Sequence, residues 1–124
     1  MKVAIIGSRG LDGDIPEELI PRKTTQIISG GAVGVDTKTR EFALSHGIQI
    51  LEILPDYDLY GKSAPILRNN VIVDASDLVI AFWDGKSRGT GYVINRCLKV
   101  NKSIIVYKMT ENGYEEHMSE VHVL

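Results

Sequence analysis

Residues 26–36 of this chain, Gln-Ile-Ile-Ser-Gly-Gly-Ala-Val-Gly-Val-Asp, decide its fold class. The first four residues predict a short buried strand, because β-branched side chains suit a pleated and packed surface. Glycines follow at Gly30, Gly31 and Gly34, and the chain then enters a segment with helical spacing. A glycine-rich turn from a strand into a helix is typical of α/β proteins that hold an anion at the start of the helix.

Runs rich in β-branched residues recur on both sides of this segment. We predict buried strands at residues 2–7, 26–29, 48–54, 77–83 and 103–107. The segments between them carry apolar side chains at helical spacing, as at Val93, Ile94 and Cys97. Strands that alternate with helices form βαβ units. We therefore expect an α/β fold, a single Rossmann-like three-layer domain with a mainly parallel sheet of about five strands.

The end of the chain has a different pattern. We assign residues 1–107 to the Rossmann-like domain and residues 108–124 to a C-terminal hairpin or tail of the same domain. Asn112 and Gly113 form a dipeptide that favours a tight hairpin turn. Residues 121–124 fit either a last edge strand or a frayed tail.

Composition narrows the function classes. The chain has 124 residues, a formal net charge of −2 and 44% hydrophobic residues. These values suit one globular domain and give no general attraction to nucleic acid or to an anionic membrane. No apolar run approaches the ~20 residues that span a bilayer. A single cysteine, Cys97, excludes an intramolecular disulfide, so we expect a cytoplasmic protein with no membrane partner.

Most of the predicted strands end in a glycine-bearing or polar loop. Such loops gather at one edge of a parallel sheet, where ligands bind near the point at which the strand order reverses. We therefore select the residues that can hold a phosphate, a ribose or a base at this edge. The candidate ligand-binding residues are Gly7, Ser8, Arg9, Gly30, Gly31, Ala32, Gly34, Asp36, Lys62, Arg68, Asn69, Trp83, Ser87, Arg88, Gly89 and Thr90.

The chemistry of these residues fits a nucleotide. Glycine loops let main-chain N–H groups approach a bulky anion, and Arg68 can hold a phosphate through two hydrogen bonds. Asn69 can contact a base or ribose edge, and Trp83 can stack on a base.

Each feature also has a purely structural explanation. The loop after residue 29 can be a tight turn with Asp36 as a helix cap or as an acid in the first turn of the helix. The loop after residue 83 can be a solvated turn with Thr90 as its N-cap. Arg68 can lie on a solvated helix face, and Trp83 can pack against a loop.

Metal chemistry has no support in the sequence. His46, His117 and His122 are far apart and lack the spacing of metal ligands, so no metal site is expected. Cys97 shares an apolar stripe with Val93 and is expected to lie in the core.

Four short motifs follow one another along the chain. They are residues 6–9 (Ile-Gly-Ser-Arg), 29–36 (Ser-Gly-Gly-Ala-Val-Gly-Val-Asp), 60–64 (Tyr-Gly-Lys-Ser-Ala) with Arg68 and Asn69, and 81–83 (Ala-Phe-Trp) through 87–90 (Ser-Arg-Gly-Thr). In this order they resemble the SLOG superfamily and, within it, the YspA-like branch. The resemblance covers residues 2–107 and implies that residues 1–107 are a SLOG-type nucleotide-binding domain. It also relates the chain to Lonely Guy phosphoribohydrolases, which cleave the N-glycosidic bond of nucleoside monophosphates, and to DNA-processing protein A, which holds single-stranded DNA.

The chain departs from the Lonely Guy pattern at one position. Those enzymes carry Pro-Gly-Gly-x-Gly-Thr-x-x-Glu, whose glutamate is needed for the chemistry. Here Val93 stands three residues after Thr90, where the glutamate is expected. A valine can neither stabilise a cationic ribose nor activate water. The carboxylates that can substitute are Asp36, which is the catalytic candidate, Asp56 and Asp84.

Three functions are open at this point. The first is a sensor or carrier domain for a nucleotide or an ADP-ribose-like ligand, which needs no catalytic acid. The second is a nucleotide-processing hydrolase of the N-glycosidase or phosphoribohydrolase kind. The third is single-stranded nucleic-acid binding, which the acidic charge balance disfavours. Whether the chain forms a homo-oligomer is open as well.

Overall fold

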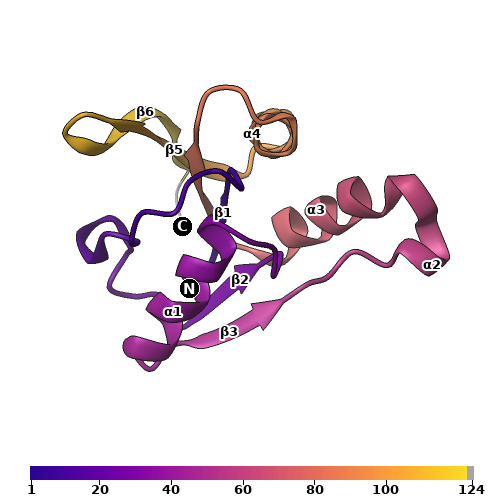
Figure 1. The fold of residues 1–124 in the computed structure, drawn as a ribbon, viewed down its shortest axis with the longest axis horizontal. Coiled ribbons are helices and arrows are strands. Elements are labelled where there is room, and N and C mark those ends of the chain that lie inside the picture. The colour runs from indigo at the N-terminus through magenta and orange to yellow at the C-terminus, as the bar shows by residue number, and fades with distance from the viewer. Residues whose placement is uncertain (123–124) are drawn as a thin grey trace.

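A six-stranded sheet lies at the centre of the computed structural model, which describes residues 1–122 (Figure 1). The strand order in space is β3-β2-β1-β4-β5-β6, and all neighbours run parallel except β5 and β6. This is the order of a doubly wound Rossmann fold, with the reversal between β1 and β4. The strands are β1 (Lys2–Gly7), β2 (Gln26–Ser29), β3 (Gln49–Glu52), β4 (Leu78–Trp83), β5 (Ser103–Thr110) and β6 (Gly113–Glu120).

Helices cover both faces of the sheet. The helix α1 (Val35–Ser45) and the 3₁₀ turn η1 (Glu17–Leu19) lie on one face, and α3 (Ala64–Ala75) and α4 (Arg88–Lys99) lie on the other. Between β3 and α3 the chain forms α2 (Tyr57–Tyr60) and the 3₁₀ turn η2 (Gly61–Ser63). The expected three-layer α/β domain is therefore confirmed. Across residues 1–122, every helix is too short or too polar to cross a bilayer.

The two faces have separate cores, because successive side chains of a strand point in opposite directions. Val3 and Ile5 belong to the core cluster that contains Phe42 of α1. Ala4 belongs to the opposite cluster together with Cys97, which is fully buried, as the sequence predicts. The central strands β1, β2 and β4 are covered on both faces, which explains their almost continuous apolar sequences.

Two strands differ from the prediction by more than one residue, and β4 begins one residue later than predicted, at Leu78. β3 is shorter than the predicted residues 48–54, because it pairs with β2, which offers only four residues for the ladder. β5 continues past the predicted end at residue 107 to Thr110, because its last residues pair with β6. Strand ends are thus set by the neighbouring strand as well as by local sequence.

The C-terminal hairpin is confirmed, although its turn differs from the usual Asn-Gly form. Glu111 and Asn112 connect Thr110 to Gly113, and among these residues only Gly113 has a positive φ, at 94°. A type I′ turn needs positive φ at both central residues, so this turn is instead the longer kind that ends on a left-handed glycine. The acidic residues 115–120 form part of β6. Residues 123–124, at the end of the expected edge strand or tail, lie outside the described residues.

Two glycines let the loop after β1 touch the loop after β2. A Cβ atom on Gly7 would lie 2.5 Å from Cγ2 of Val35. A Cβ atom on Gly34, whose φ is +74°, would lie 2.3 Å from the carbonyl oxygen of Arg9. Neither position has room for a side chain, so both need glycine for the close approach. This contact holds the backbone of Arg9 at the carboxyl edge of the sheet.

We expect Gly7→Ala to lower the free energy of unfolding by about 1–3 kcal/mol, because the added methyl group overlaps fully buried Val35. Gly10→Ala is the matched control, since a Cβ atom there meets nothing within 4 Å. That change should stay within about 0.5 kcal/mol. Urea unfolding of both variants measures the difference, and equal stabilities would contradict the close approach.

Candidate functional site

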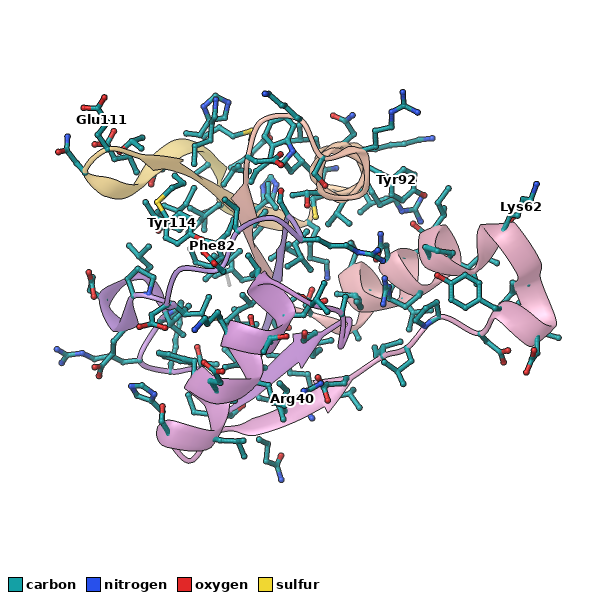
Figure 2. The ribbon with its side chains drawn as sticks, viewed as in Figure 1. Arg40, Lys62, Phe82, Tyr92, Glu111 and Tyr114 are labelled. Carbon is teal, nitrogen blue, oxygen red and sulfur yellow. The ribbon has the colours of Figure 1, made fainter. Side chains whose placement is uncertain are left out.

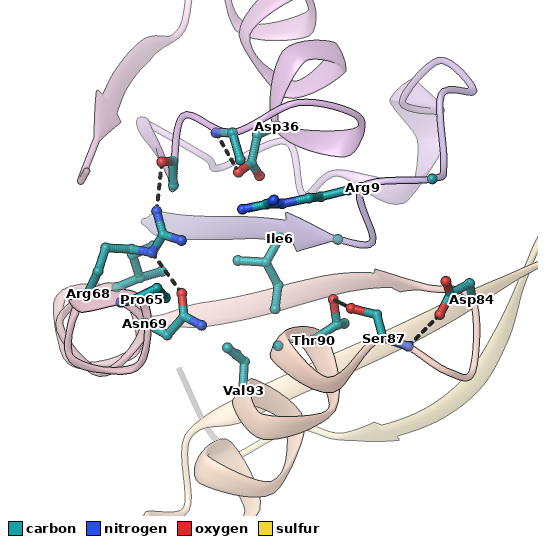
Figure 3. Close-up of a pocket in the computed structure, with 16 residues that line it drawn as sticks. Ile6, Arg9, Asp36, Pro65, Arg68, Asn69, Asp84, Ser87, Thr90 and Val93 are labelled. Carbon is teal, nitrogen blue, oxygen red and sulfur yellow. Dashed lines mark hydrogen bonds between the residues drawn. The ribbon is translucent and has the colours of Figure 1, made fainter. Parts of the chain in front are cut away.

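A cleft of about 420 Å³ opens at the carboxyl edge of the sheet, where the strand order reverses between β1 and β4 (Figure 3). Its walls come from the loops after β1, β2 and β4 and from α3 and α4. Ligands occupy this position in open α/β sheets. Most of the predicted site residues line the cleft: Gly7, Arg9, Gly30, Ala32, Asp36, Arg68, Asn69, Ser87, Gly89 and Thr90.

Two predicted residues instead hold the loop between β4 and α4 in place. Ser8 is buried, and its Oγ accepts a hydrogen bond from the main-chain N–H of Asp84 at 3.1 Å. Trp83 donates its indole Nε1–H to the carbonyl oxygen of Ser87 at 3.0 Å. Both side chains therefore support the cleft wall without lining it.

The other predicted residues outside the cleft lining differ in their roles. Gly31 and Gly34 shape the loop after β2 through positive φ angles. Arg88 is exposed at the first position of α4. Lys62 is exposed in η2, at the outer end of the segment that joins β3 to α3 (Figure 2). The sequence predicted that all these residues meet at one edge of the sheet. The side chains of Arg88 and Lys62, however, do not line the cleft.

The apolar lining of the cleft was missed by the sequence analysis. Ile6, Pro65, Ile72 and Val93 contribute to it. One signal was available, because Ile72 follows Arg68 by four residues in one helix and the two share a face. For Ile6, the side-chain direction depends on how β1 sits in the sheet, which no local pattern gives.

Arg68 joins α3 to the ends of two strands. Its Nη1 donates to the carbonyl oxygen of Gly30 at 2.8 Å and to that of Ile53 at 3.3 Å, and its Nε donates to Oδ1 of Asn69 at 2.8 Å. Burial lowers the pKa of this guanidinium, and the nearby carboxyl of Asp36 opposes that shift. The hydrogen bonds use Nη1 and Nε, so the N–H groups of Nη2 are left to meet a ligand.

Arg9 supplies a second guanidinium. Its side chain is exposed and crosses the cleft between Asp36 and Ile6 (Figure 3). Its charge acts on Arg68, whose pKa it helps to lower. An anion bound between the two guanidiniums would offset the repulsion between their like charges.

The side chain of Asp36 closes the loop after β2 through a hydrogen bond to the main chain of that loop. The carboxyl is almost fully buried, and its Oδ2 accepts the main-chain N–H of Ala32 at 3.0 Å. Burial raises the pKa of Asp36, while the Ala32 N–H and the charge of Arg68 act against the rise. The N-cap of α1 is Gly34, so Asp36 is not the cap but an acidic residue of the first turn, which closes the preceding loop and also lines the cleft.

The start of α4 faces the cleft from the other side. Oδ1 of Asp84 accepts the main-chain N–H groups of Lys86 and Ser87, each at 2.8 Å. The Ser87 and Lys86 N–H groups lower the pKa of this exposed carboxyl. The N-cap of α4 is Ser87, and Thr90 lies within the first turn. This turn directs Gly89 and Thr90 toward the cleft.

The arrangement favours an anionic ligand rich in acceptor atoms. Both guanidiniums and the first turn of α4 offer donors, and the two carboxylates already accept main-chain N–H groups of their own loops. Among residues 1–122, no group of three or more His, Cys, Asp or Glu side chains could hold a metal ion. No family model, no curated protein and no solved structure matches this chain.

Asp36→Asn should change the pH dependence of stability. Because the folded state raises the pKa of Asp36 above 3.8, the parent loses stability as pH rises through that raised pKa. The asparagine does not ionise. We therefore expect the variant to gain stability relative to the parent as pH rises from below 3.8 through the raised pKa of Asp36.

Urea unfolding at several pH values measures this difference. Asp58→Asn, the same change at an exposed carboxyl on α2, is the control. A variant-minus-parent difference at Asp36 that stays flat or falls with rising pH would contradict the burial cost assigned to this carboxyl.

Proposed function

We propose that this chain binds a nucleotide or a nucleotide-derived phosphate ligand in the cleft, as a sensor or carrier domain. One observation carries the proposal: two guanidiniums, of Arg9 and Arg68, converge on a cleft at the point where the strand order of the sheet reverses. A phosphate placed between them would receive charge-assisted hydrogen bonds from both. The main-chain N–H groups at the start of α4 add donors on the opposite wall.

The size and lining of the cleft support a ligand larger than free phosphate. Its volume of about 420 Å³ falls within the range of small-molecule sites. Ile6, Ile72 and Val93 form an apolar surface suited to a base or to the carbon face of a ribose. Oδ1 of Asn69 accepts a bond from Arg68, so its NH₂ group is the part that can donate to the ligand.

We further infer that the chain belongs to the SLOG superfamily, in its YspA-like branch. Residues from all four motifs lie at or beside the cleft, including Arg9, Gly30, Arg68 and Thr90. A doubly wound sheet agrees with that family but is shared by many others, so the motifs carry this inference. The ligand class, a nucleotide or an ADP-ribose-like molecule, follows from the same resemblance.

Thermal unfolding with AMP, ADP and ADP-ribose tests the proposal. A ligand that binds only the folded state raises the melting temperature by mass action, so at least one of these compounds should do so at millimolar concentration. Arg9→Ala should weaken its binding by about 1.5–3 kcal/mol in calorimetry, because a hydrogen bond to a charged group is lost. Arg22→Ala, which removes an exposed arginine away from the cleft, is the control. No shift with any compound, or equal affinities of all three proteins, would contradict the proposal.

A nucleotide-processing hydrolase is the second candidate, and Asp36 is the observation in its favour. A buried carboxyl with a raised pKa inside a cleft is a common feature of catalytic sites. Two features weigh against it. Val93 occupies the position of the expected glutamate and lines the cleft, and Oδ2 of Asp36 is engaged by Ala32.

We expect no release of free base from nucleoside monophosphates at the rate of a phosphoribohydrolase. Loss of general acid–base help slows such a reaction by about 10²–10⁴-fold, and Val93 supplies none. Chromatographic detection of free base is the measurement. Fast turnover that disappears in Asp36→Asn would make Asp36 catalytic and favour the hydrolase.

A further inference from the structure

The cleft contains a buried carboxyl that the binding of a phosphate does not require. Asp36 lines the cleft together with Arg9 and Arg68, and only 8% of its surface is exposed. A carboxylate beside a bound phosphate repels it, because both groups are negatively charged. The charge of Asp36 therefore bears directly on how tightly the cleft binds an anion.

Gly30 marks how close this carboxyl lies to the guanidinium of Arg68. A Cβ atom on Gly30 would lie 2.7 Å from Nη1 of Arg68 and 3.2 Å from Oδ2 of Asp36. Asp36 nevertheless forms no ion pair among the described residues 1–122. Nη1 of Arg68 instead donates to the carbonyl oxygens of Gly30 and Ile53. Arg68 therefore compensates the carboxylate through its charge and not through a hydrogen bond.

The other groups around Asp36 come from four elements. Burial is the main cause of the raised pKa of Asp36, the hydroxyl of Ser29 on β2 opposes the rise, and the charge of Glu52 on β3 adds to it. Glu52 is itself paired with Arg40 of α1, at 2.7 Å between Oε2 and Nη2. The guanidinium of Arg9 enters the cleft from the loop after β1 (Figure 3). The cations that face Asp36 without a carboxylate partner of their own are thus those of Arg9 and Arg68.

An anion bound between these two guanidiniums changes the balance at Asp36. It shares the positive charge that favours the carboxylate, and it adds a negative charge to the same cleft. Both effects favour the protonated carboxyl. Coupling between two binding events is reciprocal, so a proton on Asp36 favours the anion by the same factor. The neutral carboxyl suits a buried position, and it keeps an acceptor oxygen for the main-chain N–H of Ala32.

We propose that Asp36 couples ligand binding in the cleft to proton uptake, so that the cleft holds its anion more tightly as the pH falls. The Asp36 carboxylate takes a proton from solvent when the ligand enters and returns it when the ligand leaves. No bond of the ligand forms or breaks. The protonated carboxyl can also donate a hydrogen bond to the anion, which the carboxylate cannot do. This inference rests on the proposed function, because it needs an anion between Arg9 and Arg68.

Calorimetry in two buffers of different ionisation enthalpy measures the protons taken up on binding. The probe is ADP-ribose, because each of its two phosphates keeps a single charge across the pH series. The series begins at pH 3.8, the ordinary pKa of an aspartate, and ends at neutral pH. Proton uptake by the parent should pass through a maximum between the pKa values of Asp36 in the free and the bound protein. Asp36→Asn should take up none at that maximum, and Asp58→Asn, which changes an exposed carboxyl on α2, should match the parent.

The affinities measure the same coupling independently. The dissociation constant for ADP-ribose in the parent, divided by that in Asp36→Asn, should rise by about tenfold or more as Asp36 ionises with increasing pH. This ratio removes any titration of the ligand, so AMP or ADP can serve as the probe if either binds more tightly. The ratio of the parent to Asp58→Asn should stay constant.

A measurement on the parent alone avoids any effect of a substitution on folding. The side-chain carboxyl ¹³C signal of Asp36, followed by NMR across the pH series, should titrate at a higher pH with ADP-ribose bound than without it. A midpoint that stays or falls overturns the inference. Tight binding without proton uptake, or with a pH-independent ratio of affinities, overturns it too and leaves the proposed function standing. If AMP, ADP and ADP-ribose all fail to bind, the proposed function and this inference are both wrong.

Discussion

Where β1 and β2 end, the loop after one strand packs directly against the loop after the other, with Gly7 on Val35 and Gly34 on the carbonyl of Arg9. Because neither glycine has room for a Cβ atom, the two loops lie in direct contact. The start of α1, the turn closed by Asp36 and the backbone of Arg9 are fixed together. The shape of the cleft on this side follows from two positions that admit no side chain.

Arg68 has a structural role in the fold and also lines the cleft proposed to hold the ligand. Its bonds to the carbonyls of Gly30 and Ile53 tie α3 to the ends of β2 and β3. A half-buried guanidinium is tolerated because main-chain carbonyls and the carboxyl of Asp36 compensate it. Arg9, by contrast, is exposed and lies in a loop, so its contribution to stability is small. Of the two cations, Arg9 is therefore the cleaner probe of ligand binding.

The two sides of α3 have different surroundings. Its inner side packs on the sheet and presents Arg68 and Asn69 to the cleft. Its outer side carries apolar residues that the chain itself leaves exposed.

The sequence by itself determined the α/β class, the five parallel strands, the helical segments between them and the hairpin. These follow from short-range patterns: β-branched runs, helical spacing and glycine turns act over a few residues. It also marked the loops that meet at the sheet edge, since parallel strands bring their carboxyl ends together. Only the tertiary structure decided which residues of those loops face the cleft. Ser8 turns away to meet the N–H of Asp84, 76 residues further along the chain. Lys62 lies outside the cleft because α2 projects from the sheet. Such outcomes depend on packing between segments distant in sequence, which no local pattern encodes.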